Sequence, residues 1–312
     1  MPLIINGNAA RTDGGELPHV PGCRHSFVDA GRVRLHVAEA GDGEPLVLLH
    51  GWPQHWYMWR EVIPRLATHA RVICPDLRGF GWSAVPAGGY DKETMAGDVL
   101  ALLDALGLER VKLAGHDWGG WIGFLLAMRE PERVERLLAL GIPAPWRGRD
   151  PRGVLALWRL AYQLALSTPR LGGGRATRAI TALTPRDTRG ALAGEDLAVF
   201  TDRLTGERGR ATELLYRTFV LRELVPVALG RYSPAQLRVP TLLLFGERDV
   251  VIPVRSVRSQ AVRCGALELE VVPDVGHFIV DERPELVAER ALSFLLGRPA
   301  DAGVQGLVQR TW

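Results

Sequence analysis

A carboxylate stands in the middle of the segment KLAGHDWGGW, residues 112–121, where a serine would be the expected catalytic residue. An apolar run precedes Asp117, and small residues on both sides permit a sharp turn from a strand into a helix. This pattern is the outline of a nucleophile elbow. The plainer alternative is that Asp117 caps the helix or satisfies backbone amides in a turn.

The chemistry of a carboxylate nucleophile differs from that of a serine. A serine that attacked saturated carbon would form an ether, which a histidine-activated water could not cleave. A carboxylate forms an alkyl ester instead, and water can then attack the carbonyl carbon of that ester. Asp117 as a nucleophile therefore predicts a substrate with an electrophilic sp³ carbon, which is an epoxide or an alkyl halide.

Two further polar residues follow apolar runs later in the chain. Asp249 follows LLLFGER and His277 lies in VVPDVGHFIV, which gives the order nucleophile, acid, histidine. His277 would take a proton from water, and Asp249 would orient the imidazole and stabilise its charged form. Asp249 could instead be structural, with another acid beside the histidine. The run RLLALG is followed by no carboxylate before Asp150, which favours Asp249.

The elements that must position these residues alternate between strand-like and helix-like segments. Most of the strand-like segments are continuous apolar runs, as in parallel strands buried on both faces. We expect an α/β fold with a mostly parallel central sheet flanked by helices, and a site at the carboxyl ends of its strands. The expected strands are 32–40, 45–51, 71–79, 110–115, 136–141, 241–249 and 267–274, and the clearest helices are 93–107 and 284–297.

This alternation stops between Trp146 and Tyr232. The intervening stretch is rich in arginine and helix-like, with no convincing strand. We expect residues 146–232 to form a helical cap inserted into a core of residues 26–145 and 233–298. Residues 1–25 would be an N-terminal extension and residues 299–312 a C-terminal tail, both loosely held.

Four motifs in this order give the chain a specific resemblance. They are HGWP at 50–53, GHDWGG at 115–120, Asp249 in FGERDVVIP, and GHFIVDERPE at 276–285. On these motifs the chain resembles the α/β-hydrolase-fold proteins and, among them, the epoxide hydrolases. The resemblance implies that the backbone N–H groups of Trp52 and Trp118 form an oxyanion hole, and that a cis peptide bond precedes Pro53.

The resemblance also implies tyrosines in the cap that open the ring. An opening epoxide develops an alkoxide and benefits from an acid, whereas a halide leaves as an anion and needs only N–H donors. Tyr216 in ATELLYRTFV and Tyr162 in LWRLAYQLAL occupy the expected places, with Tyr232 in reserve. Each could instead be a packing residue on an amphipathic helix.

Two other functions compete with an epoxide hydrolase. A haloalkane dehalogenase would use the same aspartate. The fluoroacetate-type dehalogenases resemble HGWPQHWYMW closely, but they carry arginines where this chain has Trp118 and Trp121, which argues against a small carboxylate substrate. A non-catalytic α/β-hydrolase-fold protein that binds a ligand is the third hypothesis.

The residues around the expected site are apolar. Trp52, Trp118, Trp121 and Phe278 are candidates to line it, although tryptophan more often serves packing. They favour a small-molecule substrate that is an apolar epoxide, aromatic or aliphatic, over a charged one. The sequence holds no metal-ligand cluster and no dinucleotide fingerprint, and the proposed chemistry requires no cofactor.

The composition limits the remaining partners. The 38 basic residues are spread along the chain and nearly balanced by 35 acidic ones, and only Lys92 and Lys112 are lysines, so we expect no nucleic-acid partner. Three cysteines at unrelated spacings indicate neither a disulfide framework nor a zinc site. Without a signal peptide or a membrane-spanning run, we expect a cytoplasmic protein with no membrane partner. A homodimer is among the assemblies that the sequence allows.

Overall fold

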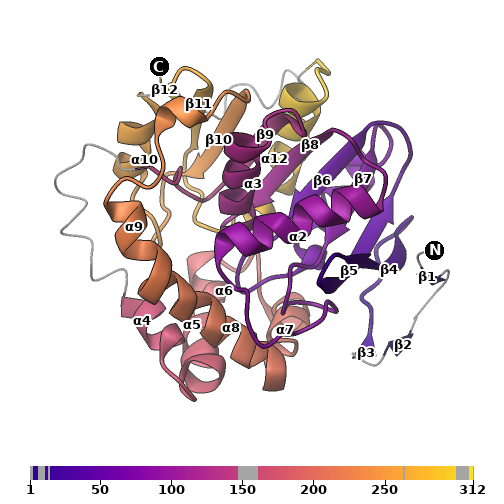
Figure 1. Cartoon of the computed structure of the whole chain (residues 1–312), viewed down its shortest axis with the longest axis vertical. Coiled ribbons are helices and arrows are strands. Elements are labelled where there is room, and N and C mark those ends of the chain that lie inside the picture. Colours follow the sequence, from indigo (N-terminus) through magenta and orange to yellow (C-terminus); the bar gives the residue numbers. More distant parts are fainter. Residues whose placement is uncertain are drawn as a thin grey trace.

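The centre of the molecule is a ten-stranded sheet with helices on both of its faces (Figure 1). The computed structural model describes residues 3–5, 11–12, 15–146, 161–262, 264–299 and 309–311. The strand order is β1-β4-β5-β7-β6-β8-β9-β10-β11-β12. The bounds are β1 (Leu3–Ile5), β4 (Arg24–Ala30), β5 (Val33–Ala40), β6 (Pro45–Leu49), β7 (Arg71–Pro75), β8 (Val111–His116), β9 (Val134–Leu140), β10 (Thr241–Gly246), β11 (Leu267–Val272) and β12 (Gln309–Thr311).

The expected α/β fold is confirmed. The strands from β7 through β6, β8, β9 and β10 to β11 pair in parallel, while β5 is antiparallel to its neighbours β4 and β7. Each of the seven expected strands is present. The strand β4, with the sequence RHSFVDA, was missed because its polar residues interrupt any apolar run. It tolerates them because four of its seven residues are only half-buried or are exposed in this antiparallel part of the sheet.

Two apolar clusters explain why the central strands have continuous apolar sequences. In β6, Val47 and Leu49 belong to the cluster that also holds residues of α2 (Lys92–Ala105) and α3 (Trp118–Arg129). Leu46 and Leu48 belong to the cluster that holds residues of α1 (Ile63–Leu66) and α12 (Pro284–Arg290). Successive side chains of a strand point to opposite faces, so a sheet covered on both faces needs apolar residues at every position. We call these faces the α2/α3 face and the α1/α12 face.

The remaining helices of the described core are short. They are α10 (Val254–Ala261) and α11 (Ile279–Glu282), with 3-10 turns η1 (Trp56–Trp59) and η5 (Pro234–Gln236). The expected helix 93–107 is α2, and the expected helix 284–297 is α12 followed by the π-helical turn η6 (Ala291–Leu295).

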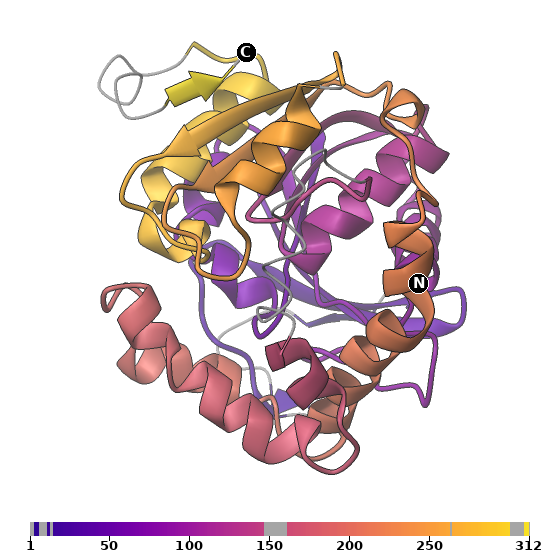
Figure 2. The same ribbon diagram turned by 90° about the vertical axis from the view of Figure 1, so that its left-hand side faces the viewer.

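A group of helices occupies the chain from residue 161 to 228 and lies mostly below the sheet in both views (Figures 1 and 2). Its members are α4 (Ala161–Ser167), η3 (Gly172–Ala176), α5 (Thr177–Thr181), α6 (Thr184–Asp187), α7 (Gly194–Thr201), α8 (Gly206–Thr218), η4 (Phe219–Glu223) and α9 (Leu224–Ala228). We call residues 161–232 the helical segment. Arg203 and Arg208 of this segment donate hydrogen bonds to the Gly81 carbonyl, in the loop after β7. Residues 147–160 of the expected cap lie outside the described residues.

Both ends of the chain contribute edge strands, which differs from the loosely held ends that we expected. β1 pairs with β4, and β12 pairs with β11. Two further strands, β2 (Arg11–Thr12) and β3 (Gly15–Glu16), form a small sheet of their own. In the part of the chain that the structure describes, no helix combines the length and the apolar character that a membrane span requires.

Candidate active site

The turn at Asp117 has the geometry of a strained elbow. β8 ends at His116, Asp117 has φ of 50°, and α3 begins at Trp118. This left-handed backbone is unfavourable for a residue with a Cβ. Close packing around the turn keeps Asp117 in this conformation. A Cβ added to Gly51 would lie 2.4 Å from the Asp117 Cβ, and a Cβ added to Gly115 would lie 2.5 Å from the Gly119 backbone. The glycines around Asp117 are thus required by contact as well as by the turn.

The Asp117 carboxylate does not serve as a helix cap. Its side chain makes no capping hydrogen bond to α3. Instead Oδ1 accepts a hydrogen bond of 3.0 Å from the Trp52 backbone N–H, and the Trp118 backbone N–H also donates to this carboxylate. Burial raises the pKa of Asp117, while His277 and these two amides act in the opposite direction. The two N–H groups expected in the oxyanion hole therefore meet at one carboxylate.

His277 connects the two aspartates. Its Nδ1 lies 2.9 Å from Asp249 Oδ2, and its Nε2 lies 3.7 Å from Asp117 Oδ2. Asp249 Oδ1 accepts backbone hydrogen bonds of 2.7 Å and 2.8 Å from Val251 and Ile252, which fix the carboxylate at the end of β10. Burial by itself would lower the pKa of His277, but Asp249 and Asp117 together raise it to about 9. The imidazole is therefore held as a cation between two carboxylates.

Tyr162 and Tyr216 come together from two helices, α4 and α8. Their ring centroids are 5.9 Å apart, and Tyr216 also packs edge-on against Trp52 at 5.5 Å and Trp118 at 5.9 Å. Tyr216 is 1% exposed. The pKa of each phenol is raised, first by burial, and the charge of Asp117 raises both further. Two protonated phenols therefore lie within the electrostatic reach of the Asp117 carboxylate.

The reserve tyrosine is not part of this group. The Tyr232 hydroxyl donates a hydrogen bond of 2.7 Å to Glu93 Oε1, on the first turn of α2. The structure thus brings together Tyr162 and Tyr216 and gives Tyr232 a different partner.

The four apolar candidates divide into two sets. Trp118 packs against Trp121 at 6.1 Å, and Trp52, Trp118 and Trp121 all belong to the cluster on the α2/α3 face. Phe278 lies against the His277 ring at 5.4 Å but belongs to the cluster on the α1/α12 face. The three tryptophans are therefore grouped with the tyrosines, whereas Phe278 supports the histidine from the other face. The peptide bond between Trp52 and Pro53 is cis, as the resemblance implied.

Some residues of the site escaped the sequence analysis. Thr212 is one of them, and its Oγ1 accepts a hydrogen bond of 3.2 Å from the Trp52 indole. His116 belongs to the GHDWGG motif, and its Nε2 lies 2.8 Å from the His277 carbonyl. Thr212 precedes Tyr216 by one helical turn, so the spacing of four residues was a usable signal for a shared face. Lys92, whose side chain lies over the Trp118 ring, gave no motif at all.

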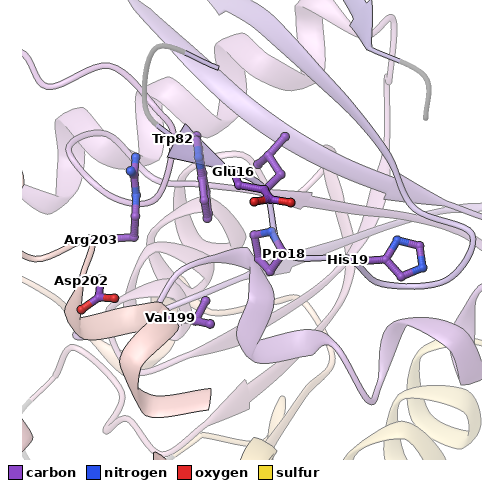
Figure 3. A pocket seen from close by; sticks show the side chains of 8 residues that line it. Glu16, Pro18, His19, Trp82, Val199, Asp202 and Arg203 are labelled. Atoms are coloured by element: carbon purple, nitrogen blue, oxygen red, sulfur yellow. The ribbon is translucent and has the colours of Figure 1, made fainter. Parts of the chain in front are cut away.

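A separate hollow of about 520 Å³ lies between the N-terminal residues 16–19 and the end of α7 (Figure 3). Trp82 and Arg203 line it, and the Arg203 guanidinium lies 4.5 Å from the centre of the Trp82 ring. None of the expected site residues lines this hollow. Among the described residues, no group of three or more histidine, cysteine, aspartate or glutamate side chains has an arrangement that could hold a metal ion.

The comparisons with known proteins agree with this geometry. The profile of the family described as alpha/beta hydrolase fold matches residues 44–284. A soluble epoxide hydrolase from a Corynebacterium species is 34% identical over 285 residues, which cover 84% of this chain and 93% of that protein. A solved structure of an epoxide hydrolase without ligand has a TM-score of 0.74 and 30% identity, over 88% of this chain and 99% of the other.

A dehalogenase is also among the relatives. A fluoroacetate dehalogenase from a Burkholderia species is 41% identical over 126 residues, which cover only 39% of this chain and 41% of that protein. The epoxide hydrolases match over nearly the whole length, in sequence and in fold. This chain is therefore a hydrolase-fold protein that belongs to the α/β-hydrolase family and, within it, to the epoxide hydrolases.

Proposed function

We propose that this protein hydrolyses an apolar epoxide to a vicinal diol through a covalent ester on Asp117. The observation that carries the proposal is the pair of phenols, half-buried Tyr162 and buried Tyr216, within the electrostatic reach of a carboxylate that a backbone amide holds by one oxygen. A nucleophile and two nearby acids suit a substrate that is attacked at carbon and protonated at oxygen.

In the first step, Asp117 Oδ2 attacks a ring carbon while Oδ1 stays on the Trp52 amide. The C–O bond of the ring breaks, and Tyr162 or Tyr216 gives its proton to the departing oxygen. The ester that forms carries no charge, so one of the two carboxylates that raise the pKa of His277 disappears. The imidazolium can then release its proton to solvent and become the base of the second step.

In the second step, His277 takes a proton from water and the hydroxide attacks Cγ of Asp117. The negative charge develops on Oδ1, to which the Trp52 amide already donates, with the Trp118 amide beside the same carboxylate. The Cγ–Oδ2 bond breaks, and the diol leaves with Oδ2 and the proton from His277. The second proton of the water, released from the new carboxyl group, returns to the tyrosinate. His277 regains a proton from solvent once the Asp117 carboxylate is restored beside it.

In this proposal the nucleophile, the second acid and the histidine belong to one part of the chain, and the ring-opening phenols belong to another. Residues 26–145 and 233–298 would be the catalytic core, and residues 146–232 the cap that supplies the phenols. The contacts of Tyr216 with Trp52 and Trp118 support this division, since they join the helical segment directly to the elbow.

A haloalkane dehalogenase is the second candidate, and one observation favours it. The Trp118 indole N–H is buried and forms no hydrogen bond of ordinary geometry with the described residues, although it lies close enough to Tyr216 to act on the pKa of that phenol. A halide could accept this N–H. The Trp52 indole already donates to Thr212 and is not free to hold a halide as well, which favours the epoxide.

A single turnover in water enriched in ¹⁸O tests the proposal. With enzyme in excess over styrene oxide, the first diol should carry unlabelled oxygen, and mass spectrometry of the digested protein should find ¹⁸O in the Asp117 peptide. Diol without label in that peptide would overturn the covalent route. Bromide release from a bromoalkane without turnover of styrene oxide would establish the dehalogenase, and binding without turnover of either would establish a ligand-binding protein.

A further inference from the structure

Lys92 is a fully buried cation beside the elbow. Its side chain is 0% exposed, and its Nζ lies 4.5 Å from the centre of the Trp118 ring and 5.3 Å from that of Phe219. A cation that has lost its water shell is attracted strongly to the face of an indole. Trp118 is the residue that follows Asp117 and donates its backbone N–H to that carboxylate.

The partner of Lys92 comes from the helical segment. Glu223 Oε2 accepts a hydrogen bond of 2.9 Å from Lys92 Nζ, and Oε1 accepts one of 2.9 Å from the Lys92 backbone N–H. Lys92 is the first residue of α2, so this N–H has no partner within its helix. One carboxylate thus compensates both a buried charge and an open helix end, which explains how a lysine can remain in this apolar place.

Lys112, the other lysine of the chain, shows what a merely structural lysine looks like in this fold. It bonds Glu44 Oε2 at 2.9 Å and Glu135 Oε2 at 3.2 Å, and the Glu44 side chain is 67% exposed. Its partners therefore lie at the surface. Lys92 differs because its ammonium group lies against the aromatic wall of the site and its partner lies on a different layer of the molecule.

We propose that Lys92 is a positioning residue, which holds the Trp118 indole against Phe219 and so fixes the backbone amide that serves Asp117. Glu223 keeps the ammonium group in place and joins η4 of the helical segment to α2. This inference rests on the proposed function, since it assigns Trp118 to the catalytic step. It adds that the elbow depends on a contact with the helical segment as well as on the sheet.

Removing only one charge would leave the other buried without a partner and endanger the fold. The test variant is therefore the double replacement Lys92→Met with Glu223→Met, which keeps a packed apolar contact. Lys112→Met is the matched control, because it removes the other lysine far from the indole. Circular dichroism and thermal unfolding establish that each variant is folded.

Single-turnover kinetics with styrene oxide gives the first readout. We expect the alkylation rate of the double variant to fall about tenfold with a smaller change in KM, as for loss of a desolvated cation–π contact. The Lys112→Met control should keep the wild-type rate. A folded double variant whose alkylation rate lies within about twofold of wild type would overturn the positioning role.

A second readout needs no activity. In a spectrum of ¹⁵N-labelled indoles, with the Trp118 signal identified by Trp118→Phe, the double variant should shift the Trp118 signal and the control should not. An unmoved Trp118 signal overturns the proposal. If the wild-type protein opens no epoxide and releases no halide, the proposed function fails while this spectrum still decides whether Lys92 holds the indole.

Discussion

The two parts of the site are held in place by different means. The side chains at the strand ends are fixed by backbone groups: Asp117 by the Trp52 amide, and Asp249 by the amides of residues 251 and 252. The phenols of the helical segment are fixed by side chains, with Tyr216 between the rings of Trp52, Trp118 and Tyr162.

The two parts also differ in how deeply their residues are buried. Every residue of β8 and β10 is buried. In the helical segment, Leu221 is 69% and Leu229 is 81% exposed. A backbone hydrogen bond survives almost any side-chain replacement, whereas a ring-to-ring contact depends on the residues at both ends. We therefore expect the hydrolytic half of the reaction to be rigidly specified, and the ring-opening half to be more sensitive to the identity of neighbouring side chains.

The largest expected effect is at the nucleophile. Asp117→Ala removes the carboxylate that we propose forms the ester, so turnover of styrene oxide should fall by roughly 10⁴-fold or more. The fold should remain, because alanine is smaller than aspartate and the apolar core around the elbow is unchanged. Diol formation measured by chromatography, with Asp104→Ala on the exposed side of α2 as the control, checks this. Normal turnover by a folded Asp117→Ala protein would remove Asp117 as the nucleophile.

The next prediction concerns His277 and separates formation of the ester from its hydrolysis. His277→Gln should leave alkylation largely possible and slow ester hydrolysis by about 10²–10⁴-fold, the usual size of general-base assistance. The Asp117 peptide should then accumulate the mass of one substrate molecule. Intact-protein mass spectrometry after a short incubation checks this. Continued absence of an adduct, at substrate concentrations where wild type turns over, would contradict the ester route.

The third prediction concerns the phenols and distinguishes the opening of an epoxide from the displacement of a halide. Tyr216→Phe and Tyr162→Phe each remove a proton donor, so epoxide opening should slow by about 10²–10⁴-fold. Displacement of bromide from a bromoalkane, which needs no proton, should change little. Stopped-flow tryptophan fluorescence gives both rates, and Tyr232→Phe serves as a control outside the group. Equal losses with both substrates would show that the phenols act by packing alone.

The smallest effect is on stability and follows from the ion pairs of His277. Its pKa is about 9 in the folded protein, above the ordinary value of 6.5, so the folded state binds the proton more tightly. This stabilisation is fully present below pH 6.5 and is lost as the pH rises through 9, and its size is on the order of 3 kcal/mol. Urea unfolding at a series of pH values checks it. Over this pH range the free energy of unfolding should fall more for the wild-type protein than for His277→Gln. The control His69→Gln, at an exposed histidine, should follow wild type. Parallel curves for wild type and His277→Gln would refute the pairing of His277 with the carboxylates.

The fold and the strand-end residues could be predicted from the sequence because their signals are local. The run KLAG, the glycines around Asp117 and the acid after LLLFGER each depend on a few neighbouring residues. The strand β4 could not be predicted, because its mixed polarity looks like that of a loop. The sequence also groups Phe278 with the tryptophans, although Phe278 and the tryptophans belong to clusters on opposite faces of the sheet. A side chain that follows a strand end can turn to either face, and only packing decides which.

The sequence by itself determined the candidate chemical groups: an aspartate at an elbow, a histidine and a second acid in the order of the family, and tyrosines in a helical stretch. Tertiary structure decided which tyrosines share the site and gave Tyr232 a different partner, Glu93. It also placed Lys92 against Trp118 and tied it to Glu223, a residue 131 positions away. Contacts between side chains so far apart in the chain leave no periodic pattern, because they depend on how whole layers pack rather than on local backbone preference.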